Sequence, residues 1–350
     1  MSAITWKILV NGEEWKKCHI ERLEYERNLH ILHQLKDHGA QVTNNGAILS
    51  DDEIDCLTAQ EAWAVSIETR TRYNGEKLLA FYQDSLKTSD AMWHKLAFST
   101  DKPMQVSRCF MEVDGISLDT YLEMIASLQT NEYNTLASHP EHFSCMIKMS
   151  DERLCGMEPF GMYGLPTMCE VRFRDVRELG AQIQADNDPE YPVDMAGAAY
   201  LIDGTPINIP YHQFKSTETG FAVKMAVYWP EHTPDEIVEG HSLHLAMEFY
   251  EGIKLAENYT LLNSSEALSK TEEEDAPLAH RKTFTMANTI EEILNDPEGM
   301  RVARKHLGKL LDRPALQSFK SKTAAEMMEL IPLPPVKKKL KAMMDELSQQ

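Results

Sequence analysis

The sequence predicts an α+β fold in which an antiparallel sheet packs around one long helix. Apolar and polar residues alternate over residues 106–113, 169–173 and 222–229, as is typical of half-buried strands. Residues 241–262 instead carry apolar side chains at the spacing of an amphipathic helix. Because the strand-like segments precede this helix, we expect a curved sheet that holds the helix and encloses a cavity.

The N-terminal region, residues 1–103, is predicted to be mainly helical after a short hairpin. Gly12 completes an Asn-Gly pair, which favours a tight hairpin turn. Residues 19–38 place leucine and isoleucine among charged residues in an amphipathic helical pattern. Ser50 followed three residues later by Glu53 is the signature of a capping box and predicts the start of another helix.

Three further segments follow from composition. Residues 104–263 hold the predicted sheet and long helix and are predicted to form one domain. Residues 264–285 are predicted to be an acidic linker, because serines there are followed by four consecutive acidic residues and a proline. Residues 286–350 have capped, amphipathic segments and are predicted to form a small helical accessory module.

Composition limits the classes of function. The formal net charge of −20 argues against nucleic acid or an anionic membrane as the partner, since both require a basic surface. The sequence has no run of eighteen apolar residues and no basic segment followed by an apolar core near its start. We therefore expect a cytoplasmic protein. Its six cysteines form no C-x-x-C pair, so we expect them to be reduced.

The most informative motif is His244 followed four residues later by Glu248. Residues four apart lie on the same face of a helix, so this imidazole and this carboxylate can bind one metal ion together. Apolar residues surround the pair, and buried polar groups need partners. A simple ion pair on a helix surface is the alternative explanation of the same spacing.

Further candidate ligands lie upstream. His139 and His142 flank a Pro-Glu pair, and the proline disfavours helical backbone at His139, which predicts a turn. Only one of these two imidazoles need then point toward a metal. Alternation places Glu170 on the same strand face as Arg172, which fits either a polar cavity wall or an exposed ion pair.

His212 and Tyr228 are candidates for proton transfer and for binding a substrate oxygen. Histidine is the side chain whose ordinary pKa lies nearest neutrality, which makes it the commonest proton carrier in catalysis. A tyrosine that points into a cavity can hydrogen-bond a phenolic or carbonyl oxygen. A histidine that simply packs in the core is the simpler explanation of His212.

Taken in order, these segments resemble the zinc-dependent family of phloretin hydrolase and 2,4-diacetylphloroglucinol hydrolase. The resemblance covers roughly residues 105–263. It rests on Asp114-Gly115, His139-Pro140-Glu141-His142-Phe143, Glu170, the segment from His212 to Gly220, and His244-x-x-x-Glu248 with Lys254-Leu255-Ala256 after it.

The resemblance implies a helix-grip (Bet v 1-like) fold and a zinc ion bound by two histidines and two glutamates. Carried over residue by residue, the implied ligands are His139, Glu170, His244 and Glu248, with His142 as the alternative to His139. The resemblance also implies that His212 is an active-site proton donor. His142 and Tyr228 complete the candidate catalytic set.

The implied activity is hydrolysis of the carbon–carbon bond between a polyhydroxylated aromatic ring and an acyl carbon, so the expected partner is a small phenolic ketone. Such a bond breaks only if the departing carbanion is delocalised. Protonating the ring carbon that bears the acyl group creates a β-diketone-like tautomer, and the ring can then leave as a stabilised enolate after water attacks the ketone. Zinc would polarise oxygens and lower the pKa of a bound water.

Two other functions remain compatible with the sequence. The same metal site could hydrolyse or decarboxylate a different small aromatic compound. A non-catalytic helix-grip protein could instead bind a small apolar or aromatic ligand, because one fold serves both purposes. The helical N-terminal region and the C-terminal module also suggest assembly, and we expect a homodimer.

Overall fold

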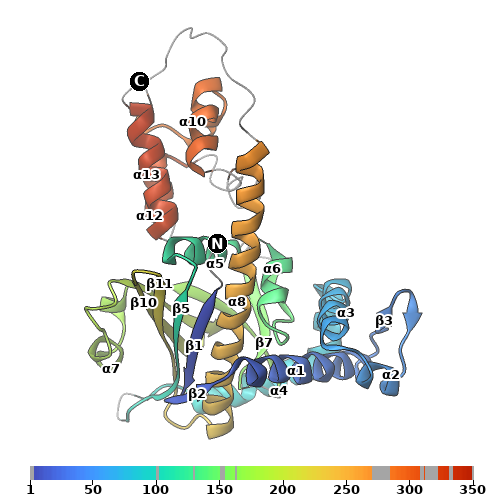
Figure 1. The fold of residues 1–350 in the computed structure, drawn as a ribbon. Helices are drawn as coiled ribbons and strands as arrows, with labels where there is room; N and C mark the ends of the chain where they lie inside the picture. Colours follow the sequence, from blue (N-terminus) through green and yellow to red (C-terminus); the bar gives the residue numbers. More distant parts are fainter. Residues whose placement is uncertain are drawn as a thin grey trace. The chain divides into compact units, whose positions relative to one another are not determined.

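The computed structural model of the chain describes residues 4–99, 102–128, 131–149, 154–161, 164–269, 284–307, 311, 322–330 and 334–348. The chain divides into two compact units. The sheet unit comprises Met1–Tyr121 and Asn131–Glu257, and the helical unit comprises Leu122–Thr130 and Asn258–Gln350. Figure 1 labels the elements of both units, which are described separately below.

The sheet unit is built on a nine-stranded sheet of order β2-β1-β5-β11-β10-β9-β8-β7-β6, with antiparallel pairing between neighbours. This confirms the predicted α+β class with a large antiparallel sheet. The strands are β1 Thr5–Val10, β2 Glu13–Trp15, β5 Gln105–Asp114, β6 Ser144–Lys148, β7 Leu154–Pro159, β8 Pro166–Phe173, β9 Val193–Leu201, β10 Pro206–Ser216 and β11 Gly220–Trp229.

The predicted hairpin and capping box are both present near the N-terminus. Asn11 and Gly12 have φ angles of 50° and 87°, the left-handed conformation that a two-residue hairpin turn requires. Ser50 Oγ accepts a hydrogen bond from the Glu53 amide, and the Glu53 carboxylate accepts one from the Ser50 amide at 2.7 Å. The elements that follow β2 are α1 Lys17–Asp37, β3 Thr43–Asn44, β4 Ala47–Ile48, α2 Asp51–Asp55, α3 Ala59–Arg72 and α4 Glu76–Leu96.

These N-terminal helices share a hydrophobic core with the far edge of the sheet. One buried cluster joins α1 and α4 to residues beside β6 and on β7, among them Ile31, Tyr82, Phe143 and Met157. The α4 helix is further fastened to β8, where Thr167 Oγ1 accepts a 2.9 Å hydrogen bond from the Trp93 indole. The helical region thus forms one compact unit with the sheet.

The long helix α8 spans Asp235–Ser269, and its first half packs on one face of the sheet (Figure 1). The ring of Phe249 lies 6.4 Å from that of Phe214 on β10, and the ring of His241 lies 5.0 Å from that of Trp229 on β11. The helix is longer than predicted at both ends. Residues 264–269 of the predicted linker are helical, since the segment contains Glu, Ala and Leu, which favour helix.

The remainder of the predicted linker, residues 270–283, lies outside the described residues. The helical unit contains α9 Ile290–Leu294, α10 Pro297–Leu307, α12 Ala324–Leu330 and α13 Pro334–Ser348, which agrees with the predicted helical character of residues 286–350. Leu340 and Leu347 of α13 and Val302 of α10 are buried there. Among the described helices, none is both long and apolar enough to cross a membrane.

The shorter elements are α5 Leu118–Leu128, α6 Glu132–Ser138, the 3₁₀ turn Val176–Glu178 and α7 Ala181–Ala185. Ile183 of α7 packs against Tyr211 and Tyr228, on the sheet face that α8 does not contact. The two faces of the central strands are therefore covered by different elements.

Close packing of two glycines sets the start of α8 against the end of β7. A Cβ added to Gly240 would lie 2.1 Å from the carbonyl oxygen of Gly161, and one added to Gly161 would lie 2.3 Å from the Cα of Ile237. Gly161 also has a φ of +83°, which favours glycine. This approach brings the segment after β7 next to the helix that carries His244.

We predict that Gly240→Ala lowers the free energy of unfolding by about 1–3 kcal/mol, because overpacking outweighs the gain in helix propensity. Gly180→Ala is the matched control, since no atom lies within 4 Å of its added Cβ; we expect it to change stability by less than about 1 kcal/mol. Urea unfolding of both variants measures the difference. Equal stability of the two variants would contradict the packing described here.

Candidate metal centre

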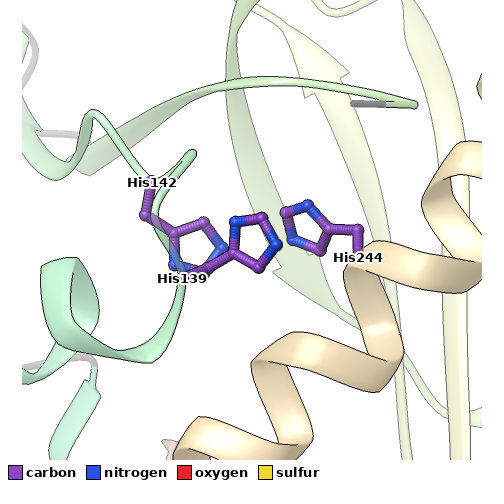
Figure 2. Close-up of side chains that lie close together, drawn as sticks. All are labelled: His139, His142 and His244. Atoms are coloured by element: carbon purple, nitrogen blue, oxygen red, sulfur yellow. The ribbon is translucent and has the colours of Figure 1, made fainter. Parts of the chain in front are cut away.

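Three buried histidines converge beneath α8. Side-chain nitrogens of His139, His142 and His244 all lie within 4.8 Å of one another. Figure 2 shows His139 and His142 on one loop, with their rings directed toward His244 on the helix. The residues are 0%, 5% and 1% exposed, respectively. A buried group of imidazole nitrogens at this spacing could hold a metal ion.

The loop that carries the first two histidines begins where α6 ends. Asn131 caps α6 by accepting a hydrogen bond from the Asn134 amide, and the helix stops at Ser138. His139 is extended, with φ −158° and ψ 137°, as expected for a residue before proline. The His142 amide then donates to the His139 carbonyl at 3.2 Å, which closes the turn. The predicted turn is confirmed.

Two carboxylates face the same imidazole nitrogens. Glu158 Oε2 lies 3.5 Å from His142 Nε2 and 3.4 Å from His244 Nε2. The Glu248 oxygens lie 4.0 Å and 3.9 Å from these two nitrogens. Tetrahedral zinc with ligands at about 2.0–2.1 Å places neighbouring ligand atoms roughly 3.3 Å apart. The Glu158 distances are close to this spacing, and the Glu248 distances are longer.

A hydrogen bond fixes the ring orientation of His142, and a carboxylate lies near the second ring nitrogen of His244. His142 Nδ1 lies 3.0 Å from the Thr135 carbonyl oxygen, so the ring proton resides there and Nε2 presents a lone pair. His244 Nδ1 lies 3.7 Å from Glu141 Oε2, and its Nε2 faces the two carboxylates. A metal-ligating histidine commonly donates its second N–H to a carbonyl or carboxylate, as His142 does here to the Thr135 carbonyl.

His139 is oriented differently. Its Nδ1 accepts a 2.9 Å hydrogen bond from the Glu141 backbone amide, so the proton of the neutral ring lies on Nε2. Nε2 has no hydrogen-bond partner among the described residues. A protonated Nε2 is a donor and cannot bind a metal. Of the two alternatives that the sequence left open, the geometry favours His142 as the ligand, with His139 beside it.

Loss of hydration shifts the pKa values of these groups toward their neutral forms. The side chains of Glu158 and Glu248 are only 21% and 28% exposed, and burial raises their pKa to about 8 and about 7. Burial also lowers the pKa of His142 to about 4 and that of His244 well below its ordinary value. A divalent cation would offset the cost of ionising the carboxylates here.

A further observation supports the fit to a metal. Glu158 Oε2 is buried and has no hydrogen-bond partner within the described part of the chain. A buried carboxylate oxygen without a partner is costly, and the cost disappears when the oxygen binds a cation. The donor set of imidazole and carboxylate is one that zinc commonly takes.

Glu170 is not brought to the histidines. It lies on β8, where its Oε2 accepts a 2.8 Å hydrogen bond from Arg172, its neighbour on the same strand face. That ion pair satisfies the carboxylate locally, as the alternative explanation of the sequence anticipated. Glu158, on the adjacent strand β7, takes the place near the imidazoles. In the sequence, Glu158 stands out only as an acidic residue between Met157 and Pro159. Both of these neighbours are buried in the structure.

His212 lies within β10. Its ring is 5.4 Å from that of Phe249 on α8, and the residue is 8% exposed. Burial lowers the pKa of His212 to about 4, so the ring is neutral near pH 7. Its Nδ1 finds no hydrogen-bond partner among the described residues. His212 therefore faces the helix side of the sheet as a buried, neutral imidazole.

Tyr228 lies on the opposite face of the sheet from His212. His212 pairs with Met225 on β11, and Tyr228 is three residues further along, so its side chain points the other way. The Tyr228 hydroxyl donates to the Asp186 carboxylate, which also pairs with Arg108. The predicted catalytic role of Tyr228 is therefore not supported by its position, because strand alternation separates it from the histidines.

Sequence reasoning overlooked His241. Its ring stacks on that of His244 with centroids 4.8 Å apart, and the residue is 5% exposed. The signal was present, since His241, His244 and Glu248 follow at positions i, i+3 and i+7 and share one helix face. Burial lowers the pKa of His241 to about 3, so this ring is also neutral near pH 7.

No family model matches the sequence, and no curated protein matches it. The class that the fold and site define is an α+β protein with a buried group of three histidines that could hold a metal ion.

The geometry predicts different results for the two glutamates on β7 and β8. Glu158→Gln should weaken zinc binding at least roughly 10–100-fold, since it removes a charged oxygen that faces both His142 and His244. Glu170→Gln, on the neighbouring strand, should leave the affinity within about twofold. Competition with a chromophoric chelator measures both constants. A larger loss in the Glu170 variant would restore the ligand set that the sequence resemblance implied.

Proposed function

We propose that this protein is a zinc-dependent hydrolase whose metal ligands are His142, His244, Glu158 and Glu248. The observation that carries the proposal is the convergence of two imidazole Nε2 atoms and two carboxylates at 3.4–4.0 Å beneath α8. Two histidines and two glutamates match the number and kind of ligands in the family that the sequence resembles, although different positions supply two of them. A bound zinc ion would polarise a substrate oxygen and lower the pKa of a nearby water.

Cleavage of a carbon–carbon bond in a small phenolic ketone is the reaction that we propose for this site. The rings of Phe160, Trp229 and Phe249 lie beside His241 and His212, and such aromatic neighbours favour a planar aromatic substrate. The overall reaction consumes one water and gives a carboxylic acid and the free polyphenol. The helix-grip fold belongs to the same proposal, supported by the packing of α8 across the sheet.

His212 is proposed to move the proton that makes the ring a leaving group. A neutral imidazole, which the lowered pKa favours, can accept a proton from a ring hydroxyl. The imidazolium then returns that proton to the ring carbon that bears the acyl group, which yields the β-diketone-like tautomer. Water adds to the ketone carbon, the bond to the ring breaks, and its electron pair is delocalised over the ring as an enolate.

Metal content tests the first part of the proposal. We expect about one zinc per chain in the purified protein, and loss of that zinc in His244→Ala and in Glu248→Ala. His232→Ala is the matched control, because that side chain is 63% exposed; it should retain the metal. Elemental analysis after dialysis measures all four proteins. A metal-free wild-type protein with a stable fold would refute the hydrolase and favour a ligand-binding protein.

Cleavage assays test the second part. The zinc-loaded protein should hydrolyse phloretin or an acylphloroglucinol, with release of the acid and the polyphenol measured by chromatography. His212→Ala should retain zinc but lose about 10²–10⁴-fold in turnover, the usual contribution of acid–base catalysis. A zinc-loaded protein that binds these compounds without cleaving them would contradict the proposed reaction and leave the metal site intact.

A further inference from the structure

Two arginines from the N-terminal helices lie buried beside the histidine loop. Arg27 of α1 is 0% exposed and Arg70 of α3 is 1% exposed. Burying a guanidinium is costly unless good hydrogen bonds or an ion pair compensate for lost hydration. The groups that the two guanidiniums contact explain why both can be buried.

Arg70 holds both ends of the histidine turn. Its Nη1 donates to the carbonyl oxygens of His139 and His142, at 2.9 Å and 2.8 Å. Its Nε donates to the Ser66 carbonyl on its own helix at 3.4 Å. The guanidinium thus ties the backbone of both residues to α3. Because the backbone positions set where the two imidazoles can reach, this tie fixes His142 relative to the sheet.

Arg27 acts on the other side of the same turn through Glu141. The two side chains form an ion pair, and both are 0% exposed. Glu141 Oε2 lies 3.7 Å from His244 Nδ1, while its backbone amide donates to His139 Nδ1 at 2.9 Å. Glu141 therefore faces two of the three histidines. A carboxylate beside Nδ1 favours the His244 tautomer in which Nε2 is free for a metal.

We propose that Arg70, Arg27 and Glu141 are positioning residues that hold the metal-binding histidines in place and so raise the affinity for the metal. The helical N-terminal region then contributes residues that support the metal centre. The inference rests on the proposed metal site, and it extends that site to groups that would not touch the metal. Arginine suits this task better than lysine, because its planar guanidinium holds Nε toward the Ser66 carbonyl while Nη1 reaches the other two carbonyl oxygens.

The test measures zinc affinity of the full-length chain by competition with a chromophoric chelator. Arg70→Lys keeps a positive charge but loses the planar guanidinium, and we expect roughly 10–100-fold weaker binding. Arg72→Lys is the matched control on the same helix, since Arg72 is 36% exposed and bonds Thr43 rather than the histidine turn. We expect the control to bind zinc within about twofold of wild type.

A double variant that removes both charges of the Arg27–Glu141 ion pair provides a second test, in case Arg70→Lys fails to fold. Removing one partner of a buried ion pair leaves an uncompensated charge, whereas removing both charges is far better tolerated. Arg27→Met combined with Glu141→Gln should therefore fold, as checked by circular dichroism, yet bind zinc roughly tenfold or more weakly. Cobalt-loaded protein adds a spectroscopic signature: at saturating cobalt, a misplaced His244 should change the visible absorption bands.

The outcomes separate this inference from the proposed function. Folded Arg70→Lys and paired variants that bind zinc within twofold of wild type, with unchanged cobalt spectra, would overturn the positioning role while the metal site stands. Weaker zinc binding with altered cobalt spectra, against an unaffected Arg72→Lys, would support it. A wild-type protein that binds neither metal would defeat the proposed function, and this inference with it.

Discussion

Polar groups buried around the histidine loop impose the constraint on which this structure depends. Three imidazoles, the Arg27–Glu141 ion pair and the Arg70 guanidinium all lie out of water beside the histidine loop. Each must find a partner, because an unpaired polar group in a protein interior costs several kcal/mol, of order 2–7. Backbone carbonyls, carboxylates and the proposed metal supply partners for His142, Arg27 and Arg70, and together they determine how the loop is held.

The arrangement depends on contributions from distant parts of the chain. Arg70 comes from α3, His142 from the loop after α6, Glu158 from β7 and His244 from α8. The close approach of Gly240 to Gly161 brings the last two of these elements together. A core that the N-terminal helices share with the sheet edge then fixes the first two. The grouping of these side chains is therefore a property of the folded sheet unit as a whole.

Much of the fold followed from local pattern. Alternation identified β5 and β11, the Asn-Gly turn identified the first hairpin, and the Ser50–Glu53 box marked the start of α2. Helix ends were harder, since α8 continues to Ser269, past two serines that suggested the start of a linker. Of the site, His244 and Glu248 could be paired from their spacing alone, because helical periodicity is local.

The sequence by itself determined the class of fold, the candidate histidines and the helix face that carries His244 and Glu248. Only the tertiary structure decided which partners join them. Glu170 looked suitable on its strand, but Arg172 neutralises it there, while Glu158 on the next strand reaches the imidazoles. Strand order, sheet face and buried hydrogen bonds are set by contacts between residues far apart in the chain, and no local pattern encodes them.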